Sequence, residues 1–205
     1  MDKNIEIEIR GPLSKEKFND LMSFFNKEGK VLPEKNRILI DYSTFLEGGV
    51  ENRNKDIRLR ITNGVPEIII KIGKWGGTDQ RKELSVLTNP NSFDTLVEIF
   101  AELGLKKGML CVRRSKIYEY QGIEFAMVEV PNHSYYYEAE KMAHGDEDSG
   151  QITEEIERVC RNLQLEIFDK KTFFKYIELL NKEANEVFDY TTTFRPNYFK
   201  NRFGL

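Results

Sequence analysis

Apolar and charged residues alternate strictly at the start of the chain. Every second position of residues 5–9 is isoleucine, whereas Glu6, Glu8 and Arg10 occupy the positions between and after them. A period of two places the isoleucines on one face of a β-strand over residues 4–10 and the charged residues on the other. The same kind of pattern predicts further strands over residues 37–46, 56–62, 67–72, 81–87, 109–120, 123–130 and 135–142.

Four other segments have their apolar residues at helical spacing. They predict helices over residues 14–28, 92–103, 153–163 and 170–184. The strands come in runs joined by turns, and Asn63-Gly64 is a strong hairpin signal between two of them. Such runs indicate antiparallel pairing and an α+β class in place of βαβ units. Eight strands are enough to close a barrel of modest bore.

Charge is abundant but balanced. Charged residues make up 32% of the chain, above the ~25% usual for globular proteins, yet the net charge is only -3. A balance of this kind does not indicate a nucleic acid or an anionic membrane as partner. The apolar runs are far too short for a bilayer span, and the first residues lack the apolar core of a signal peptide. Cys111 and Cys160 form no CxxC pair, so we expect a reduced, cytoplasmic protein.

The last residues differ from the rest. Residues 185–205 are rich in aromatic and basic side chains and show no clear period. We interpret residues 1–184 as one domain and residues 185–205 as a C-terminal tail. A tail so aromatic is expected to pack against its own domain or against the mate in a homodimer. The functional alternative is a lid at the mouth of a tunnel.

The second face of the strands carries almost nothing but Glu, Arg and Lys. Its members are Glu6, Glu8, Arg10, Arg58, Arg60, Lys71, Arg81, Glu83, Arg113, Glu138 and Glu140. An open sheet laced with salt bridges is one arrangement that fits, and a closed barrel with the charges inside is the other. The amphipathic helices favour the barrel, because they need an apolar outer wall to cover. A lumen of unpaired charge is very unfavourable, so it must hold water, metal ions or a charged ligand.

The two signs of charge suggest different partners. Each Glu-x-Glu places two carboxylates on one side of a strand, and the pairs Glu6/Glu8 and Glu138/Glu140 would converge if their strands were neighbours. Clustered carboxylates favour a hard divalent cation, Mg²⁺ or Mn²⁺. Arginine and lysine opposite them suit phosphate oxygens. A metal together with many cations implies a small polyanion, and a triphosphate has the natural size.

This order of motifs resembles the CYTH superfamily of triphosphate tunnel metalloenzymes, over about residues 4–180. Glu6-Ile-Glu8-Ile-Arg10 resembles its ExExK signature, Arg58-Leu-Arg60 its Arg-x-Arg strand, and Arg81-Lys-Glu83 its RxE strand. Lys71, Arg113 and Tyr137-Glu138-Ala-Glu140 resemble the tunnel lysine, the basic strand of the second half and the closing E-x-E. The resemblance implies a closed antiparallel eight-stranded β-tunnel with a charged lumen and helices packed outside.

The resemblance also implies roles. Metal ligands would be Glu6, Glu8, Glu83, Glu138 and Glu140. Substrate-binding cations would be Arg58, Arg60, Lys71, Arg81 and Arg113, and the catalytic set would be Glu6, Glu8, Arg10 and Lys71. Two positions depart from the family, because Arg10 replaces its lysine and Val128 stands where the family has Asp. The loss of that acid puts a second metal site in question.

Three functions are consistent with these features. The leading interpretation is a metal-dependent hydrolase of a small triphosphate: inorganic triphosphate, thiamine triphosphate or a nucleoside triphosphate. The alternatives are a class IV-type adenylyl cyclase and a non-catalytic binder of nucleotides or polyphosphate. The organic part of the substrate stays open: Trp75, Tyr118 and Tyr135 to Tyr137 are candidates to stack on a ring, although aromatic residues beside strands are more often core.

Overall fold

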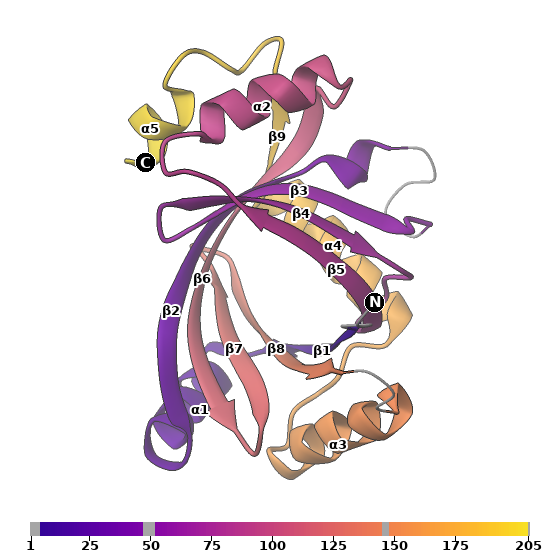
Figure 1. Ribbon diagram of the computed structural model, residues 1–205. Coiled ribbons are helices and arrows are strands. Elements are labelled where there is room, and N and C mark those ends of the chain that lie inside the picture. The colour runs from indigo at the N-terminus through magenta and orange to yellow at the C-terminus, as the bar shows by residue number, and fades with distance from the viewer. Residues whose placement is uncertain (1–4, 47–51, 145–147, 205) are drawn as a thin grey trace.

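The computed structural model describes residues 5–46, 52–144 and 148–204 and shows a closed β-barrel with helices around it (Figure 1). The strands pair antiparallel in the order β2-β3-β4-β5-β1-β8-β7-β6, and pairing of β2 with β6 closes the ring. The barrel strands are β1 Ile5–Leu13, β2 Lys30–Asp41, β3 Lys55–Thr62, β4 Val65–Ile72, β5 Thr78–Leu87, β6 Lys107–Tyr120, β7 Ile123–Val130 and β8 Ser134–Ala143. The eight-stranded α+β barrel predicted from the sequence is confirmed.

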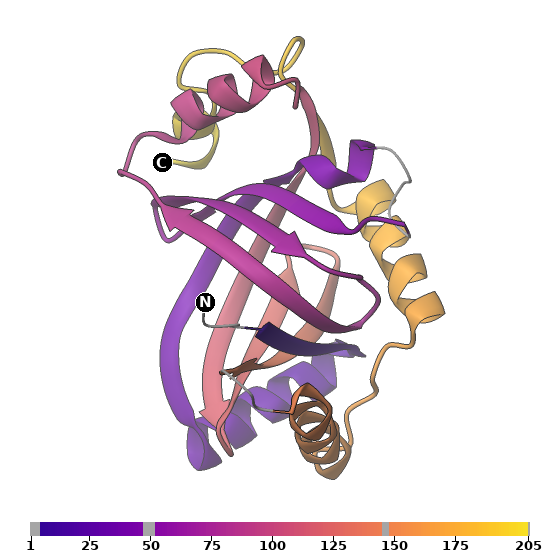
Figure 2. The ribbon, with the colours of Figure 1, turned by 45° about the vertical axis from the view of Figure 1, so that its right-hand side comes forward.

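The helices lie on the outside of the barrel. They are α1 Lys15–Glu28, the 3₁₀ helix η1 Tyr42–Phe45, α2 Phe93–Glu102, α3 Ser149–Asn162, α4 Lys170–Glu183 and α5 Tyr198–Phe203. In Figures 1 and 2, α2 and α5 lie together at one end of the barrel, α1 and α3 lie toward the other, and α4 runs beside the wall. Each described helix is too short or too polar to cross a membrane.

The apolar face of the strands points outward, toward the helices, as predicted. Ile7 and Ile9 of β1 are fully buried in one cluster with Phe25 of α1 and Ile156 of α3. A second cluster joins β2 and β3 to α2 on another part of the wall. Burial of apolar surface stabilises a fold by about 25 cal/mol per Å². The helices therefore hold the barrel closed and leave the opposite strand face to line the lumen.

The boundaries predicted for one strand and one helix differ most from the structure. The strand predicted over 37–46 spans Lys30–Asp41 instead, and residues 42–45 form η1. Pro33 obscures the first half of this strand, and the pairing with β6 shifts register between Leu32 and Lys35. The helix predicted from Thr153 begins at Ser149, because the carboxylate of Asp148 caps it by accepting from the backbone N–H groups of Gly150 and Gln151.

The C-terminal residues add a strand and a helix to the barrel. β9 Glu186–Asp189 pairs with the start of β6, along the edge whose later part pairs with β7. Phe188 and Phe199 are 1% exposed and pack with Phe93 of α2. Of the two alternatives for this segment, the described residues 186–204 show packing against their own domain. The division of the chain at residue 184 stays a prediction.

Gly11 of β1 marks a close crossing of two chain segments. A Cβ atom at this position would lie 1.8 Å from the backbone oxygen of Glu166. Next to it, the N–H of Phe168 donates to the carbonyl of Arg10 at 2.9 Å, so the link between α3 and α4 is attached to β1. We expect Gly11→Ala to lower the free energy of unfolding by about 1–3 kcal/mol through this clash. Urea denaturation checks it, with Gly76→Ala, whose Cβ would meet nothing nearer than 3.5 Å, as the control.

Candidate metal and phosphate site

The barrel encloses a cavity of about 320 Å³. Most of the residues predicted for the site line it: Glu6, Glu8, Arg10, Arg58, Arg60, Lys71, Glu83, Arg113, Glu138 and Glu140. Arg81 is the exception, because it lies beneath the lining with only 2% of its surface exposed. The alternation of the strands thus brings the predicted residues into one shared space, and the alternative of an open, water-facing sheet is wrong.

Three carboxylates converge inside this cavity. β1 pairs with β8, and the register places Glu8 directly opposite Glu140. One oxygen from each of Glu6, Glu8 and Glu140 lies within 4.8 Å of the others. The convergence expected from the two Glu-x-Glu motifs is therefore present, with three of the four carboxylates taking part.

Burial and mutual repulsion set the protonation of these acids. Burial and then the charges of Glu8 and Glu6 hold the pKa of Glu140 well above its usual value. Burial and the charge of Glu8 also raise the pKa of Glu6. For Glu8 the burial would raise the pKa, but the positive charges of Arg10, Lys71 and Arg81 outweigh it and hold the pKa far below its ordinary value. The carboxylate of Glu140 is therefore compensated by fewer positive charges than the carboxylate of Glu8.

The donor set fits a hard divalent cation. Carboxylate oxygens are the ligands that Mg²⁺ and Mn²⁺ prefer, and clustered acids with raised pKa values gain most from such an ion. In the structure, Arg10 forms an ion pair with Glu8, and Nζ of Lys71 lies 2.7 and 2.5 Å from the two oxygens of Glu6. Glu6, Glu8 and Glu140 are therefore the residues that would hold a metal.

The other two predicted metal ligands contact cations instead. Glu83 of β5 lies 3.1 Å from Nζ of Lys71. Glu138 of β8 lies 3.4 Å from Nε of Arg10. Their metal-binding roles stay predictions, and their observed contacts place them as partners of the basic residues that border the carboxylate cluster.

Basic side chains approach the same cavity from the strands opposite. Arg58 and Arg60 lie on β3, where Arg58 contacts Asp56 at 2.7 Å and Arg60 makes two hydrogen bonds to Glu67. Arg113 of β6 donates to the side-chain oxygen of Asn185 at 3.0 Å. Carboxylates and an amide therefore orient these guanidinium groups before any anion arrives, and orientation in advance lowers the cost of binding.

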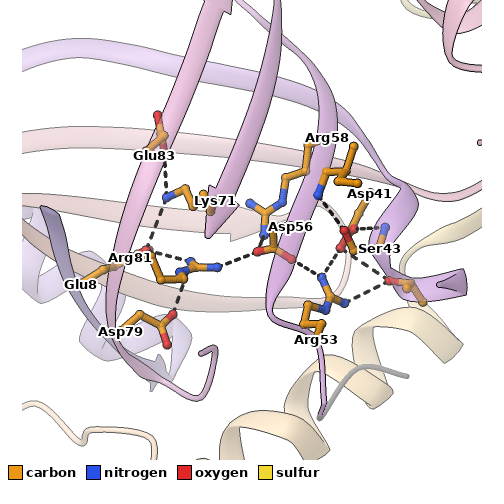
Figure 3. Close-up of polar contacts among 12 residues, drawn as sticks. Glu8, Asp41, Ser43, Arg53, Asp56, Arg58, Lys71, Asp79, Arg81 and Glu83 are labelled. Carbon is orange, nitrogen blue, oxygen red and sulfur yellow. Dashed lines mark hydrogen bonds and ion pairs between the residues drawn. The ribbon is translucent and has the colours of Figure 1, made fainter. Parts of the chain in front are cut away.

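Beneath the cavity lies a network of buried ion pairs that the sequence analysis missed (Figure 3). Asp56 is fully buried and accepts hydrogen bonds from Arg53 at 2.5 Å, Arg81 at 2.6 Å and Arg58 at 2.7 Å. Arg81 also lies 3.3 Å from Asp79, and Arg53 lies 2.8 Å from Asp41. The network joins the ends of β2, β3 and β5 and supports Arg58 from below.

Two lining cations were also missed. Lys35 and Arg37 of β2 line the cavity. Their period-two spacing was a usable signal, but the predicted strand began only at residue 37, so Lys35 lay outside it and Arg37 was not assigned to the site. Asp56 and Asp79 continue the Asp-x-Arg alternation of β3 and β5 toward the strand starts. Asp56 lay inside the predicted strand 56–62 but was not assigned to the site, and Asp79 lay before the predicted strand 81–87.

Apart from Arg113, the residues that β6 and β7 contribute to the cavity lining are neutral. Ile117, Ala126 and Val128 point inward and form a small cluster with Leu32 and Tyr136. Val128, at the position where the CYTH pattern has an acid, is 1% exposed.

The predicted ring-stacking candidates divide into two groups. Trp75 and Tyr136 line the cavity. Tyr118, Tyr135 and Tyr137 belong to the outer core with α1.

A closed eight-stranded barrel with clustered carboxylates facing arginines and lysines is the triphosphate-tunnel fold. Solved structures agree with this assignment. The PH1819 protein of Pyrococcus horikoshii is similar with a TM-score of 0.68 and 21% identity, over 87% of this chain and 99% of that one. No family model matches the chain, and no curated protein matches it in sequence.

Two further similar structures have descriptions that mention an activity. HpAC1 of Hippeastrum, described as a candidate adenylyl cyclase with a dominant triphosphatase activity, has a TM-score of 0.55 and 14% identity, over 88% of this chain and 99% of that one. A candidate adenylate cyclase of Vibrio parahaemolyticus has a TM-score of 0.55 and 13% identity, over 78% and 89% of the two chains. These similarities show that the chain shares its fold with these structures.

Proposed function

We propose that this protein is a metal-dependent hydrolase of a small triphosphate. One observation supports the proposal most directly: three carboxylates within 4.8 Å of one another face arginines and lysines across a cavity of about 320 Å³. Acids alone would suit a metal, and cations alone would suit an anion. Their combination in one enclosed space suits a metal-bound polyphosphate. The triphosphatase activity described for HpAC1, which has the same fold, supports the choice of reaction.

The residues divide the work by position. Glu6, Glu8 and Glu140 would hold Mg²⁺ or Mn²⁺, which when bound supplies positive charge to the phosphate oxygens. Arg58, Arg60 and Arg113, with Lys71 once a metal replaces its contact to Glu6, would bind the remaining oxygens. Water attacks the terminal phosphorus, the bond from that phosphorus to the bridging oxygen breaks, and a proton is released to solvent. The arginines neutralise the charge that grows on the bridging oxygen.

The proposal is tested by phosphate release from tripolyphosphate, thiamine triphosphate and ATP. We expect turnover with Mg²⁺ or Mn²⁺, and loss of turnover in excess EDTA that is restored by adding the metal back. Activity unchanged by EDTA would contradict the metal requirement. Binding of all three compounds without any phosphate release would contradict the hydrolase and leave the cyclase and the non-catalytic alternative.

The adenylyl cyclase alternative has support of its own in the description of the Vibrio parahaemolyticus structure. A cyclase would use the same carboxylates and cations, but the nucleophile would be the ribose 3′-hydroxyl of ATP. Separation of the ATP products decides between the reactions. We expect ADP and phosphate, whereas cyclic AMP with pyrophosphate would replace the hydrolase by the cyclase.

A further inference from the structure

Neutral and aromatic residues line the cavity as well as the charged residues of the candidate triphosphate site. Charged residues line the cavity on β1 to β5 and on β8, and β6 adds Arg113, whereas the rest of the wall of β6 and β7 presents the neutral residues Cys111, Ser115 and Val128. Helix α4 adds Tyr176, Ile177 and Leu180 on the adjoining side. A chain of phosphates gains nothing from an apolar wall, so this part of the cavity is suited to a different chemical group.

Five aromatic rings form a continuous arc along this side. Trp75 packs edge-on against Phe173 at 4.8 Å between ring centroids, and Phe173 meets Phe168 at 6.0 Å. Phe168 stacks on Tyr176 at 5.1 Å, and Tyr176 meets Tyr136 at 5.9 Å. All five residues line the cavity. The rings come from a loop, from β8 and from the segment at α4, so the arc exists only in the folded chain.

The arc is held in place and borders the charged centre. The hydroxyl of Tyr176 is 2.8 Å from that of Ser134, which fixes the ring on the wall. At the other end, the guanidinium of Arg10 lies 5.5 Å from the centre of the Phe173 ring. Tyr136 and Glu138 are next-but-one neighbours on the lumen side of β8. A ligand that places phosphates at the charged centre would therefore reach the arc with its next few atoms.

Two buried polar groups at this wall have no partner. Trp75 is 8% exposed and Ser115 is 4% exposed, and both line the cavity. Neither the indole Nε1 of Trp75 nor the hydroxyl of Ser115 has a hydrogen-bond partner. An unpartnered buried donor destabilises the folded protein. A ligand that carries hydrogen-bond acceptors would relieve this cost, whereas a purely hydrocarbon group would not.

We propose that the aromatic arc binds the organic group of the substrate, a planar aromatic ring with hydrogen-bond acceptors, and that the substrate is a triphosphate ester of an alcohol carrying such a ring. This inference rests on the proposed function for the position of the phosphates. It predicts that the protein binds triphosphate esters such as ATP and thiamine triphosphate more tightly than inorganic triphosphate. Flat rings gain from stacking on aromatic side chains at little entropic cost.

The test compares two variants of one residue. Tyr176→Ala removes a ring from the arc, and we expect KM for ATP or thiamine triphosphate, whichever the protein prefers, to rise about tenfold or more, the scale of one lost stacking contact. KM for tripolyphosphate should stay within about twofold, because phosphates do not stack. Tyr176→Phe keeps the ring and loses only the hydroxyl contact to Ser134, so its KM for the ester should rise much less than that of Tyr176→Ala. Leu179→Ala, an exposed position on α4, controls for changes in the helix itself.

Binding can be followed without turnover, because Trp75 is the only tryptophan of the chain. We expect adenylyl imidodiphosphate with Mg²⁺ to change its emission, and tripolyphosphate with Mg²⁺ to change it much less. An equal response to both compounds, or equal effects of Tyr176→Ala on esters and tripolyphosphate, would overturn the inference while leaving a triphosphatase. Emission changes specific to the ester without any hydrolysis would overturn the proposed function and support the aromatic site.

Discussion

Glu140→Gln is expected to lower metal-dependent triphosphate cleavage by about 100-fold or more, a size typical of interactions with a catalytic metal. The same change is expected to make the metal-free protein more stable. Glu140 is one of three carboxylates that would hold the metal, so its loss weakens metal binding. It is also the acid whose pKa is raised by burial and by the charges of Glu8 and Glu6, so without a metal its ionisation opposes folding. One substitution thus tests both effects of the Glu140 carboxylate: its contribution to metal binding and its destabilisation of the metal-free protein.

The pH dependence has a definite sign. A carboxyl group whose pKa is raised on folding stabilises the native state below its unfolded pKa, about 4.3 for glutamate. That contribution is lost as pH rises through the raised folded pKa of Glu140. The melting temperature of the wild type in EDTA should therefore fall with pH above about 4.3 more steeply than that of Glu140→Gln. Adding Mg²⁺ or Mn²⁺ should raise the melting temperature of the wild type and change that of the variant much less.

A matched control comes from another glutamate that is half-buried and paired. Glu155 of α3 contacts Lys141 at 2.8 Å, outside the cavity. Glu155→Gln should leave the metal-induced rise in melting temperature and the cleavage rate nearly unchanged. A full metal response in Glu140→Gln would place the ion elsewhere in the cavity. A less stable metal-free variant would show that the Glu140 carboxylate is satisfied in the native state.

The barrel could be predicted because the strand period of two and the helical period of 3.6 lead to the same arrangement. Alternation on β1, β3 and β4 separates apolar from charged residues, and the helices supply matching apolar faces, so only one side of the sheet can be covered. The prediction failed at β2, where Pro33 and a shift of register interrupt the pattern. The pairing of β9 with β6 was also missed, since four residues beside a turn carry no periodic signal. The alternation of residues is sufficient to predict a regular strand. It is insufficient where a strand is irregular, as in β2, or very short, as in β9.

The site shows a similar division. Residue type and strand face were enough to place Glu6, Glu8 and Glu140 in one cavity. They were not enough to separate Arg81 from the lining residues, because burial beneath a lumen depends on the tilt of the strands and not on alternation. The pairing of Asp56 with three arginines was also beyond the sequence, since the partners come from two strands and the turn before β3. Which ion pairs form in a barrel depends on its closure.

Asp56→Asn is expected to destabilise the protein by about 3–5 kcal/mol, the cost of leaving buried charges without their partner. Asp56 is 1% exposed and accepts hydrogen bonds from Arg53, Arg58 and Arg81. Asparagine keeps the size of the side chain but removes its negative charge, so three buried guanidinium groups lose their common counter-ion. Urea denaturation of the metal-free protein measures the change. Glu157→Gln, in the exposed pair with Arg161 on α3, should cost less than about 1 kcal/mol.

The loss caused by Asp56→Asn should itself depend on pH. Burial would raise the pKa of Asp56, but Arg58, Arg53 and Arg81 outweigh it and hold the pKa far below that of an ordinary aspartate. A lowered folded pKa gives stability that is fully present above the unfolded pKa, about 3.9, and is lost as pH falls toward the folded value. The difference between wild type and Asp56→Asn should therefore be constant near neutral pH and shrink below about pH 3.9. A difference that stays small at neutral pH would mean that the arginines find other partners in the barrel, and the Asp56 network would then not be what holds these strand ends together.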